Sequence, residues 1–321
     1  MRFLIVGYSS IVARRALAAL VRCPEVESVD IASRRRAQGT SFPESWTGRI
    51  YDDYGEAISC SDADVVYISL VNSLHEEWAD TALRSGRHVV VDKPAFLSLA
   101  VTDKLLELAA KKGLCLAEAV VFPYHPQMEV LQTLLLDHGG ATRLSATFTF
   151  PPLTNENFRN HPELGGGSLY DLGPYAAAVS RLFFEDLPAS VRCNVVTRHS
   201  DTKVDTAFSL LASYIGGRSY IGHFGFDTEY QNRLTLIGPA ISITVDHIFT
   251  THPDLENHLH VSSGSQHSRV PMGAGDSFQC FFARLIGAIE KHCWSVFAED
   301  LRQDAQILGT IRAAVLGEGH R

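Results

Sequence analysis

The 321-residue sequence lacks the features that mark a zinc protein, a disulfide-stabilised protein or a membrane protein. Its six cysteines are scattered, with no C-x-x-C pair and no cysteine–histidine group, so neither a metal site nor a disulfide framework is predicted. No apolar stretch approaches membrane-spanning length. A strand-like run begins directly after the first two residues, which leaves no room for a signal peptide. We therefore expect a cytoplasmic protein that binds no metal and no membrane.

An excess of positive charge is also missing. The formal net charge is −8 at pH 7 and the isoelectric point is about 5.9, which argues against a nucleic-acid-binding surface. The chain contains no repeat, no low-complexity segment and no obvious linker. Its 45% hydrophobic and 20% charged residues are ordinary for a globular protein, and its length is sufficient for two domains with separate cores. A small molecule is the expected substrate.

The first third of the chain alternates strand and helix patterns. Apolar strand-like runs and helical patterns follow one another at 2–6, 11–21, 26–32, 65–70, 75–85, 89–91, 97–112 and 114–119. Such alternation predicts βαβ units and a doubly wound parallel sheet. We therefore expect a dinucleotide-binding Rossmann domain over residues 1–121.

The rest of the chain, residues 122–321, has a different pattern. Longer β-type runs occur at 143–150, 191–198, 206–215, 219–226, 233–237 and 241–245. Short connections at Gly216-Gly217 and Gly238-Pro239 predict hairpins, and helical patterns lie at 168–184, 277–292 and 298–316. This predicts a second domain on a large, mostly antiparallel open sheet. Because helices cover only one face of such a sheet, we expect the other face to form a homodimer or homotetramer contact.

The tripeptide Asp92-Lys93-Pro94 ends the apolar run at 88–91. Proline cannot continue a strand's hydrogen bonding, so Lys93 is predicted to project from a strand end. In an open parallel sheet that edge binds ligands, and an ammonium there can polarise a substrate oxygen. A solvated loop lysine is the alternative.

A second motif follows the first strand, where a G-x-G-x-x-G fingerprint would stand. Only the first glycine, Gly7, is present, and Val12 replaces the last. Gly7 provides the tight turn, and Ser9 is small enough to let backbone N–H groups meet a pyrophosphate at the helix start, together with Ser10 and Ile11. An ordinary turn of an α/β protein with another purpose is the alternative.

The choice between the two nicotinamide cofactors is made near the tip of the second strand. Ser33, Arg34 and Arg35 stand there, and arginine binds a phosphate monoester through forked, charge-assisted hydrogen bonds. Asp30 is the competing signal for a ribose hydroxyl, but it lies within the strand. Three arginines also suit a solvated helix start. We predict that NADPH binds in preference to NADH.

A third motif is the glycine-rich segment 164–175. Its three glycines, Gly167 among them, let the backbone approach a ligand closely. A helix after them would place Asp171 and Tyr175 four residues apart on one face. The Tyr175 hydroxyl can protonate a developing alkoxide, and Lys93 nearby would lower its pKa. A buried tyrosine hydrogen-bonded to an aspartate is the alternative.

These motifs resemble the glucose-fructose oxidoreductase and inositol dehydrogenase family, Gfo/Idh/MocA, over nearly the whole chain. The family's strand-end Glu-Lys-Pro appears as Asp92-Lys93-Pro94, and its D-x-G-x-H element as residues 171–175, with Tyr175 where the dehydrogenases usually carry histidine. Together with the segments 32–35, 74–78, 125–127 and 148–152, this exchange is similar to the branch of nucleotide-linked sugar 3-ketoreductases from deoxysugar pathways.

The resemblance implies further site residues. Further cofactor contacts are expected at Leu70, Asn72, His75, Asp92 and Lys93. Of these, Asn72 and His75 are expected to touch the nicotinamide ribose. Six residues are expected to contact the substrate. Phe150 would supply an aromatic platform, Arg159 a positive charge and Gly167 a close backbone approach. Asp171, Tyr230 and Asn232 would line the sugar pocket. Each also has a structural alternative, such as a surface arginine at 159 or sheet core at 150.

Three functions remain open at this point. The first is NADPH-dependent reduction of a keto group, at C3 by the resemblance, on a nucleotide-linked hexose. The second is oxidation of a free sugar or polyol, against which Tyr175 counts because a histidine is the better base at neutral pH. The third is a non-catalytic cofactor-binding protein, against which the intact Lys93, Asp171 and Tyr175 count.

Overall fold

The computed structural model describes residues 1–34, 46 and 48–317. Two compact units are present. The first comprises Met1–Val121 and Phe278–Arg302, and the second comprises Phe122–Ser277 and Gln303–Arg321. Residues 278–302, which the sequence pattern assigned to the second domain, belong to the first unit.

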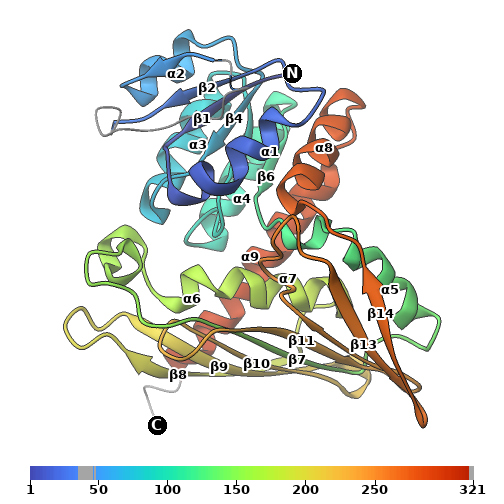
Figure 1. Cartoon of the computed structure of the whole chain (residues 1–321). Coiled ribbons are helices and arrows are strands. Elements are labelled where there is room, and N and C mark those ends of the chain that lie inside the picture. Colours follow the sequence, from blue (N-terminus) through green and yellow to red (C-terminus); the bar gives the residue numbers. More distant parts are fainter. Residues whose placement is uncertain (35–45, 47, 318–321) are drawn as a thin grey trace. The chain divides into compact units, whose positions relative to one another are not determined.

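The first unit contains a six-stranded, wholly parallel sheet in the order β3-β2-β1-β4-β5-β6 (Figure 1). Its strands are β1 (Arg2–Val6), β2 (Ser28–Ala32), β3 (Ile50–Tyr51), β4 (Val65–Ile68), β5 (His88–Val91) and β6 (Leu116–Glu118). Its helices are α1 (Leu17–Val21), α2 (Tyr54–Cys60), α3 (His75–Arg84), α4 (Leu99–Lys112) and α8 (Ser277–Glu290). The strand order reverses between β1 and β4, which is the switch point where such sheets bind ligands.

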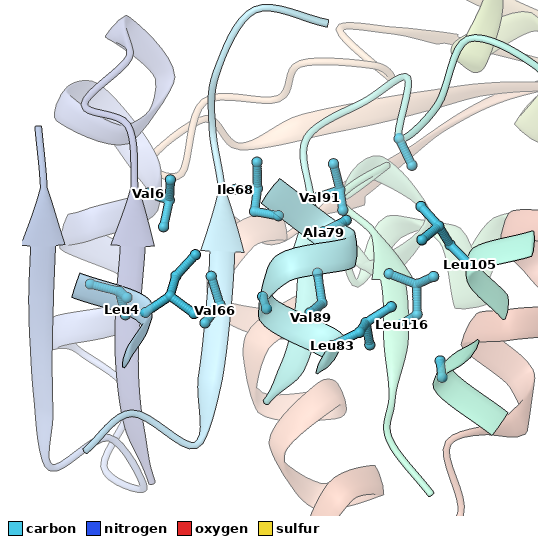
Figure 2. Close-up of a cluster of buried hydrophobic side chains, with 14 of the residues drawn as sticks. Leu4, Val6, Val66, Ile68, Ala79, Leu83, Val89, Val91, Leu105 and Leu116 are labelled. Carbon is cyan, nitrogen blue, oxygen red and sulfur yellow. The ribbon is translucent and has the colours of Figure 1, made fainter. Parts of the chain in front are cut away.

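The core of this unit lies between the sheet and its covering helices. Alternate residues of β1, β4 and β5 point toward α3 and α4 in Figure 2, and all are fully buried. The labelled side chains are Leu4, Val6, Val66, Ile68, Ala79, Leu83, Val89, Val91, Leu105 and Leu116. Strands buried on both faces read as continuous apolar runs, which explains why the sequence pattern identified them.

The second unit contains an eight-stranded sheet in the order β14-β13-β12-β11-β7-β10-β9-β8. Its strands are β7 (Arg143–Thr149), β8 (Ser190–Arg198), β9 (Asp205–Tyr214), β10 (Arg218–Gly225), β11 (Gln231–Ile237), β12 (Ser242–Asp246), β13 (Asn257–Ser263) and β14 (Gln266–Met272). All neighbouring pairs are antiparallel except β7 and β10. The fold is therefore a Rossmann sheet plus a large, mostly antiparallel open sheet, as predicted.

Helices of the second unit lie on one face of its sheet (Figure 1). They are α5 (Gln127–Leu136), α6 (Ser168–Asp171), α7 (Gly173–Phe184) and the end of α9 (Ser295–Gly317). A forked ion pair joins Arg181 of α7 to the buried Asp304 of α9, with N–O distances of 2.8 and 3.0 Å. Gly173 makes the close packing possible, because a Cβ there would lie 2.5 Å from Leu308.

The described residues contain no disulfide, no metal-binding group and no membrane-spanning helix. All six cysteines are free thiols. Within residues 1–34, 46 and 48–317, no three His, Cys, Asp or Glu side chains group in a way that suits a metal ion. Over the same residues, no helix combines the length and apolarity needed to cross a membrane.

Candidate active site

The turn after β1 is built around Gly7. Its φ of +97° lies in the region that favours glycine. A Cβ at this position would lie 2.2 Å from the carbonyl oxygen of Ser69, which follows β4. Only glycine therefore lets the first strand turn so close to the fourth.

Ser9 connects this turn to β4. Its hydroxyl lies 2.7 Å from that of Ser69 and accepts a hydrogen bond from the N–H of Val12 at 3.3 Å. The helix that follows opens with a π-helical segment, Val12–Ala16, and the Val12 side chain is fully buried there. Ser10 is exposed and Ile11 half-buried at the helix start. This opening is the part of the chain expected to meet the pyrophosphate.

Ser33 and Arg34 follow the end of β2. The Ser33 N–H donates to the carbonyl oxygen of Tyr51 at 2.9 Å. The guanidinium of Arg34 lies over the Tyr54 ring, 4.6 Å from its centroid, and the residue is exposed. Arg34 is thus stacked beyond the strand tip, where a 2′-phosphate is expected. Arg35 lies outside the described residues.

Asp30, the competing acid, is engaged elsewhere. It lies inside β2 opposite Leu4, is 6% exposed, and accepts a hydrogen bond from the Arg49 N–H at 2.8 Å. The Arg49 guanidinium also lies 3.3 Å from the carboxylate, and the charge of Asp30 raises the pKa of Arg49. The Asp30 carboxylate is thus paired with both the backbone N–H and the guanidinium of Arg49.

Asp92 follows β5 and joins the hydrogen bonds of the neighbouring strand. Its carboxylate accepts from the hydroxyls of Tyr67 and Ser69. Burial raises the pKa of Asp92, and these two hydrogen bonds oppose the rise. Lys93 is half-buried and precedes a cis peptide bond to Pro94. Hydrogen bonds from Ser9 to Ser69 and from Ser69 to Asp92 therefore connect the predicted pyrophosphate turn to the residue before the predicted catalytic lysine.

His75 and Asn72 are buried residues near this edge. The His75 ring nitrogens lie 2.9 Å from the Pro94 carbonyl oxygen and 3.1 Å from that of Leu70. The ring is fully buried, and this burial lowers its pKa. Asn72 is 6% exposed. His75 thus ties the loop after β4 to the turn after Lys93, and its contact with a nicotinamide ribose stays a prediction.

In the second unit, the glycine-rich segment closes tightly before α6. Gly167 has a φ of +114°, and a Cβ there would lie 2.7 Å from the Asp205 carboxylate. That carboxylate accepts from the Ser168 hydroxyl at 2.7 Å and the Leu169 N–H at 2.6 Å. Asp205, at the start of β9, therefore fixes the first turn of α6.

Asp171 ends α6 and is paired with Arg159. The Arg159 Nε lies 2.8 Å from the Asp171 carboxylate, whose side chain is only 6% exposed. Arg159 also stacks on Phe158, at 4.7 Å from the ring centroid. The structure therefore brings together two residues that the sequence analysis assigned to the substrate separately.

The helix carrying Asp171 and Tyr175 is interrupted. The expected single helix over 168–184 is two helices, α6 and α7, with a break at Leu172 followed by Gly173 and Pro174. Proline lacks the N–H that would continue the first helix. Asp171 and Tyr175 therefore do not share one continuous helical face.

The Tyr175 ring is surrounded by phenylalanines. Its centroid lies 5.1 Å from that of Phe148, 5.6 Å from that of Phe249 and 6.0 Å from that of Phe122. The three phenylalanines are buried, whereas Tyr175 is half-buried. The ring is thus held by apolar edges and faces.

Three further predicted substrate residues lie at one end of the sheet. Phe150 is half-buried and stacks on Phe226 at 5.9 Å. Tyr230 is 38% exposed, and its hydroxyl accepts from Asn232 at 3.1 Å. Asn232 is 5% exposed. Substrate contact stays a prediction for all three.

Four residues of the site were missed by the sequence analysis. They are Tyr67, Ser69, Asp205 and Phe249. A tyrosine inside a buried parallel strand requires a hydroxyl partner, so Tyr67 carried a usable signal. Phe249 carried no such signal, because it lies in an irregular segment after β12 that has no hydrophobic periodicity. Lys93 belongs to the first unit and Tyr175 to the second, so the action of Lys93 on Tyr175 stays a prediction.

Family models account for both parts of the chain. Residues 1–120 match the model described as "Oxidoreductase family, NAD-binding Rossmann fold", and residues 137–244 match the "GFO/IDH/MocA C-terminal domain". The chain belongs to the GFO/IDH/MocA oxidoreductase family. The family inferred from the sequence motifs is thereby confirmed.

Individual family members are similar over most of their length. A dTDP-3,4-didehydro-2,6-dideoxy-alpha-D-glucose 3-reductase of Actinomadura kijaniata is 30% identical over 96% of this chain and 93% of its own. A D-xylose 1-dehydrogenase (NADP(+)) of Haloferax volcanii is 31% identical over 71% of this chain and 70% of its own.

A solved structure shows the same fold. KijD10, a 3-ketoreductase from A. kijaniata in complex with NADP and TDP-benzene, superimposes with a TM-score of 0.90 at 27% identity, covering 98% of each chain. Variants of KijD10 with a tyrosine changed to phenylalanine and with a lysine changed to alanine have also been solved with both ligands.

Proposed function

We propose that this GFO/IDH/MocA protein is an NADPH-dependent reductase of a keto group, at C3, of a nucleotide-linked hexose in deoxysugar biosynthesis. The observation that carries the proposal is Tyr175, a half-buried phenol held among three phenylalanines. A phenol hydroxyl is a hydrogen-bond donor and can act as a general acid. It is therefore suited to donate a proton to an alkoxide, which is the requirement of reduction.

The strand ends of the first unit fit a dinucleotide phosphate. The close turn at Gly7 and the exposed helix start at Ser10 support a pyrophosphate contact through backbone N–H groups. Ser33 and the stacked Arg34 support a 2′-phosphate contact. NADPH, when bound, supplies hydride to the keto carbon.

The chain's own residues supply the proton and the charge. In the proposed reaction the carbonyl π bond opens as its carbon accepts hydride, and its oxygen takes the proton of the Tyr175 hydroxyl. Lys93 polarises that oxygen through its ammonium group. Asp171 is proposed to orient the substrate and to hold Arg159 by the ion pair.

The nucleotide part of the substrate is proposed to bind the second unit. Exposed Tyr230 and half-buried Phe150 offer aromatic surface, and Arg159 offers positive charge for a diphosphate. The similarity to the dTDP-sugar 3-reductase, and the TDP-benzene complex of KijD10, support this class of substrate. We also propose that the reaction takes place in the cytoplasm.

The decisive experiment compares one keto hexose with and without its nucleoside diphosphate, at saturating NADPH. Because remote binding energy holds the keto carbon at hydride distance, the linked sugar is expected to have the higher kcat. A nucleoside diphosphate alone is expected to inhibit competitively. Equal turnover of both forms, without inhibition by any nucleotide, would refute the proposal.

Oxidation of a free sugar is the second candidate. The observation that favours it is the 31% identity to the D-xylose 1-dehydrogenase of H. volcanii. Assaying NADP⁺ with D-xylose and related pentoses tests it directly. Turnover of these sugars at rates above those of the nucleotide-linked keto sugar would favour the dehydrogenase.

We also propose that the open face of the second sheet forms a homo-oligomer, a dimer or tetramer. Leu211 of β9 and Ile221 of β10 are paired neighbours, 44% and 57% exposed. Changing Ile221 to glutamate is expected to reduce the mass measured by light scattering. Ile215→Glu is the control, because Ile215 lies in the turn between β9 and β10 and is 78% exposed. A monomeric wild-type protein would overturn this proposal.

A further inference from the structure

The side-chain amide of Asn232 in β11 is fully used in donating hydrogen bonds. Its Nδ2 donates to the Tyr230 hydroxyl at 3.1 Å and to the Thr250 hydroxyl at 2.9 Å, and its Oδ1 accepts from the Phe249 N–H at 3.0 Å. An asparagine amide carries two N–H donors. Both are engaged inside the protein, and the residue is 5% exposed.

The backbone of Asn232 holds the same segment. Its carbonyl oxygen accepts from the His247 N–H at 2.6 Å. His247 has a φ of +55°, a left-handed conformation that residues with a Cβ adopt rarely. The His247 carbonyl oxygen in turn accepts from the Thr251 hydroxyl at 2.6 Å. Segment 247–251 is therefore a compact turn fastened to β11.

This turn carries Phe249 to the Tyr175 ring. Phe249 stacks on Phe148 with centroids 5.2 Å apart, meets Phe122 at 5.3 Å, and meets Tyr175 at 5.6 Å. Phe148 belongs to β7 and Phe122 to a short 3₁₀ helix. Phe249 alone of these three rings lies on a segment without regular structure. Its own N–H donates to Asn232, and its segment is also held by the hydrogen bond from Gln127 to the Thr251 hydroxyl at 3.1 Å.

We infer that Asn232 is a positioning residue, which fixes Phe249 and through it the ring of Tyr175. This inference rests on the proposed role of Tyr175 as proton donor. This positioning role replaces the direct sugar contact expected of Asn232. Tyr230, whose hydroxyl accepts from Asn232, is then the exposed neighbour. Small displacements of a reacting group are costly in rate, up to about a hundredfold for 1 Å.

The test uses Asn232→Leu, which removes all three side-chain hydrogen bonds while keeping a similar size. With the nucleotide-linked keto sugar and saturating NADPH, kcat is expected to fall about tenfold to a hundredfold, with little change in KM. In a Tyr175→Phe background the same substitution is expected to change kcat little, because no proton donor remains to be positioned. An equal fractional loss of kcat in both backgrounds would overturn the inference.

Two further variants test whether the loss of kcat in Asn232→Leu comes from general misfolding. Asn232→Asp keeps an acceptor for the Phe249 N–H, and the hydroxyls of Thr250 and Tyr230 can turn to donate to it, so most of the wild-type kcat is expected. Thr235→Val on the same strand removes a 3.1 Å contact with Thr244 and is expected to leave kcat unchanged. A loss in Thr235→Val as large as that in Asn232→Leu would contradict a specific role of Asn232.

A second measurement separates this inference from the proposed function. Unfolding free energies of Asn232→Leu, Phe249→Leu and the double variant form a thermodynamic cycle that needs no activity. Non-additive losses are expected, because both changes release the same ring. Additive losses would overturn the inference even in a working reductase, whereas a wild-type protein inactive on every nucleotide-linked keto sugar refutes only the proposed function.

Discussion

The Nε atom of Arg159 lies 2.8 Å from the carboxylate of Asp171, and the aspartate side chain is almost completely buried. The positive charge expected to meet a substrate diphosphate is thus already paired inside the protein. A diphosphate at this site would share the guanidinium with Asp171, which arginine's several N–H donors permit.

Removing Arg159 is expected to destabilise the fold. Arg159→Ala removes the ion pair with the buried Asp171 carboxylate, at a cost of about 3 kcal/mol. The double variant Arg159→Ala/Asp171→Asn removes the carboxylate charge as well and is expected to be more stable than the single one. Urea unfolding of the three proteins measures both effects. A double variant less stable than Arg159→Ala would show that the pair is not the cause.

Arg34→Ala is expected to reduce the preference for NADPH over NADH about tenfold or more. Each charge-assisted contact to phosphate contributes roughly 1.5 to 3 kcal/mol. Dissociation constants for both cofactors, measured by fluorescence titration, give the ratio. Arg22→Ala removes the same charge at the end of α1 and serves as the control. An unchanged ratio in Arg34→Ala would assign the preference to other residues.

Tyr175→Phe is expected to lower kcat by roughly 10² to 10⁴, the usual contribution of general acid catalysis, with KM little changed. Lys93→Met is expected to lose turnover as well. Steady-state kinetics on the nucleotide-linked keto sugar provides the measurement. Tyr170→Phe is the matched control, because that hydroxyl bonds to Arg312 of α9 instead. A Tyr175→Phe variant that shows only a raised KM would make Tyr175 a binding residue.

Stability is expected to fall in mild acid because of His75. Burial lowers the pKa of this ring below its ordinary value of 6.5. Between the two pKa values the unfolded chain binds more protons than the folded one, so the free energy of unfolding decreases as the pH falls through about 6.5.

The His75→Asn variant is the test of that pH dependence. Its free energy of unfolding, measured in urea between pH 5 and 8, is expected to change less with pH than that of the wild type. His88, whose pKa is also lowered by burial, contributes in the same direction, so some slope remains in the variant. Identical slopes in both proteins would exclude His75 as a source.

Elements whose burial or turn geometry restricts the residue types were predictable from the sequence. The parallel strands read as continuous apolar runs, and the hairpins at Gly216-Gly217 and Gly238-Pro239 are real antiparallel connections. Strands β13 and β14 were missed because β14 is an edge strand with mostly exposed polar side chains. Such a strand is specified by its partner rather than by its own pattern.

The candidate site was predictable where one residue type fits the geometry. Gly7 and Gly167 have backbone conformations and contacts that exclude a Cβ. The ion pair of Arg159 with Asp171 and the role of Phe249 depend on tertiary contacts between distant segments. No local sequence pattern encodes such contacts. The helix break at Leu172 arises from Pro174, which stands in the first turn of α7 and lacks the N–H that would continue α6.

The return of α8 to the first sheet has a consequence for the order of synthesis. Phe282 of α8 packs edge-on against Phe3 of β1 and Tyr67 of β4, at 5.9 and 5.8 Å. A nascent chain that has only reached residue 121 therefore presents those two rings without their cover. The first unit can be completed only after the polypeptide has emerged beyond Phe282, so the second sheet has been translated in full by then.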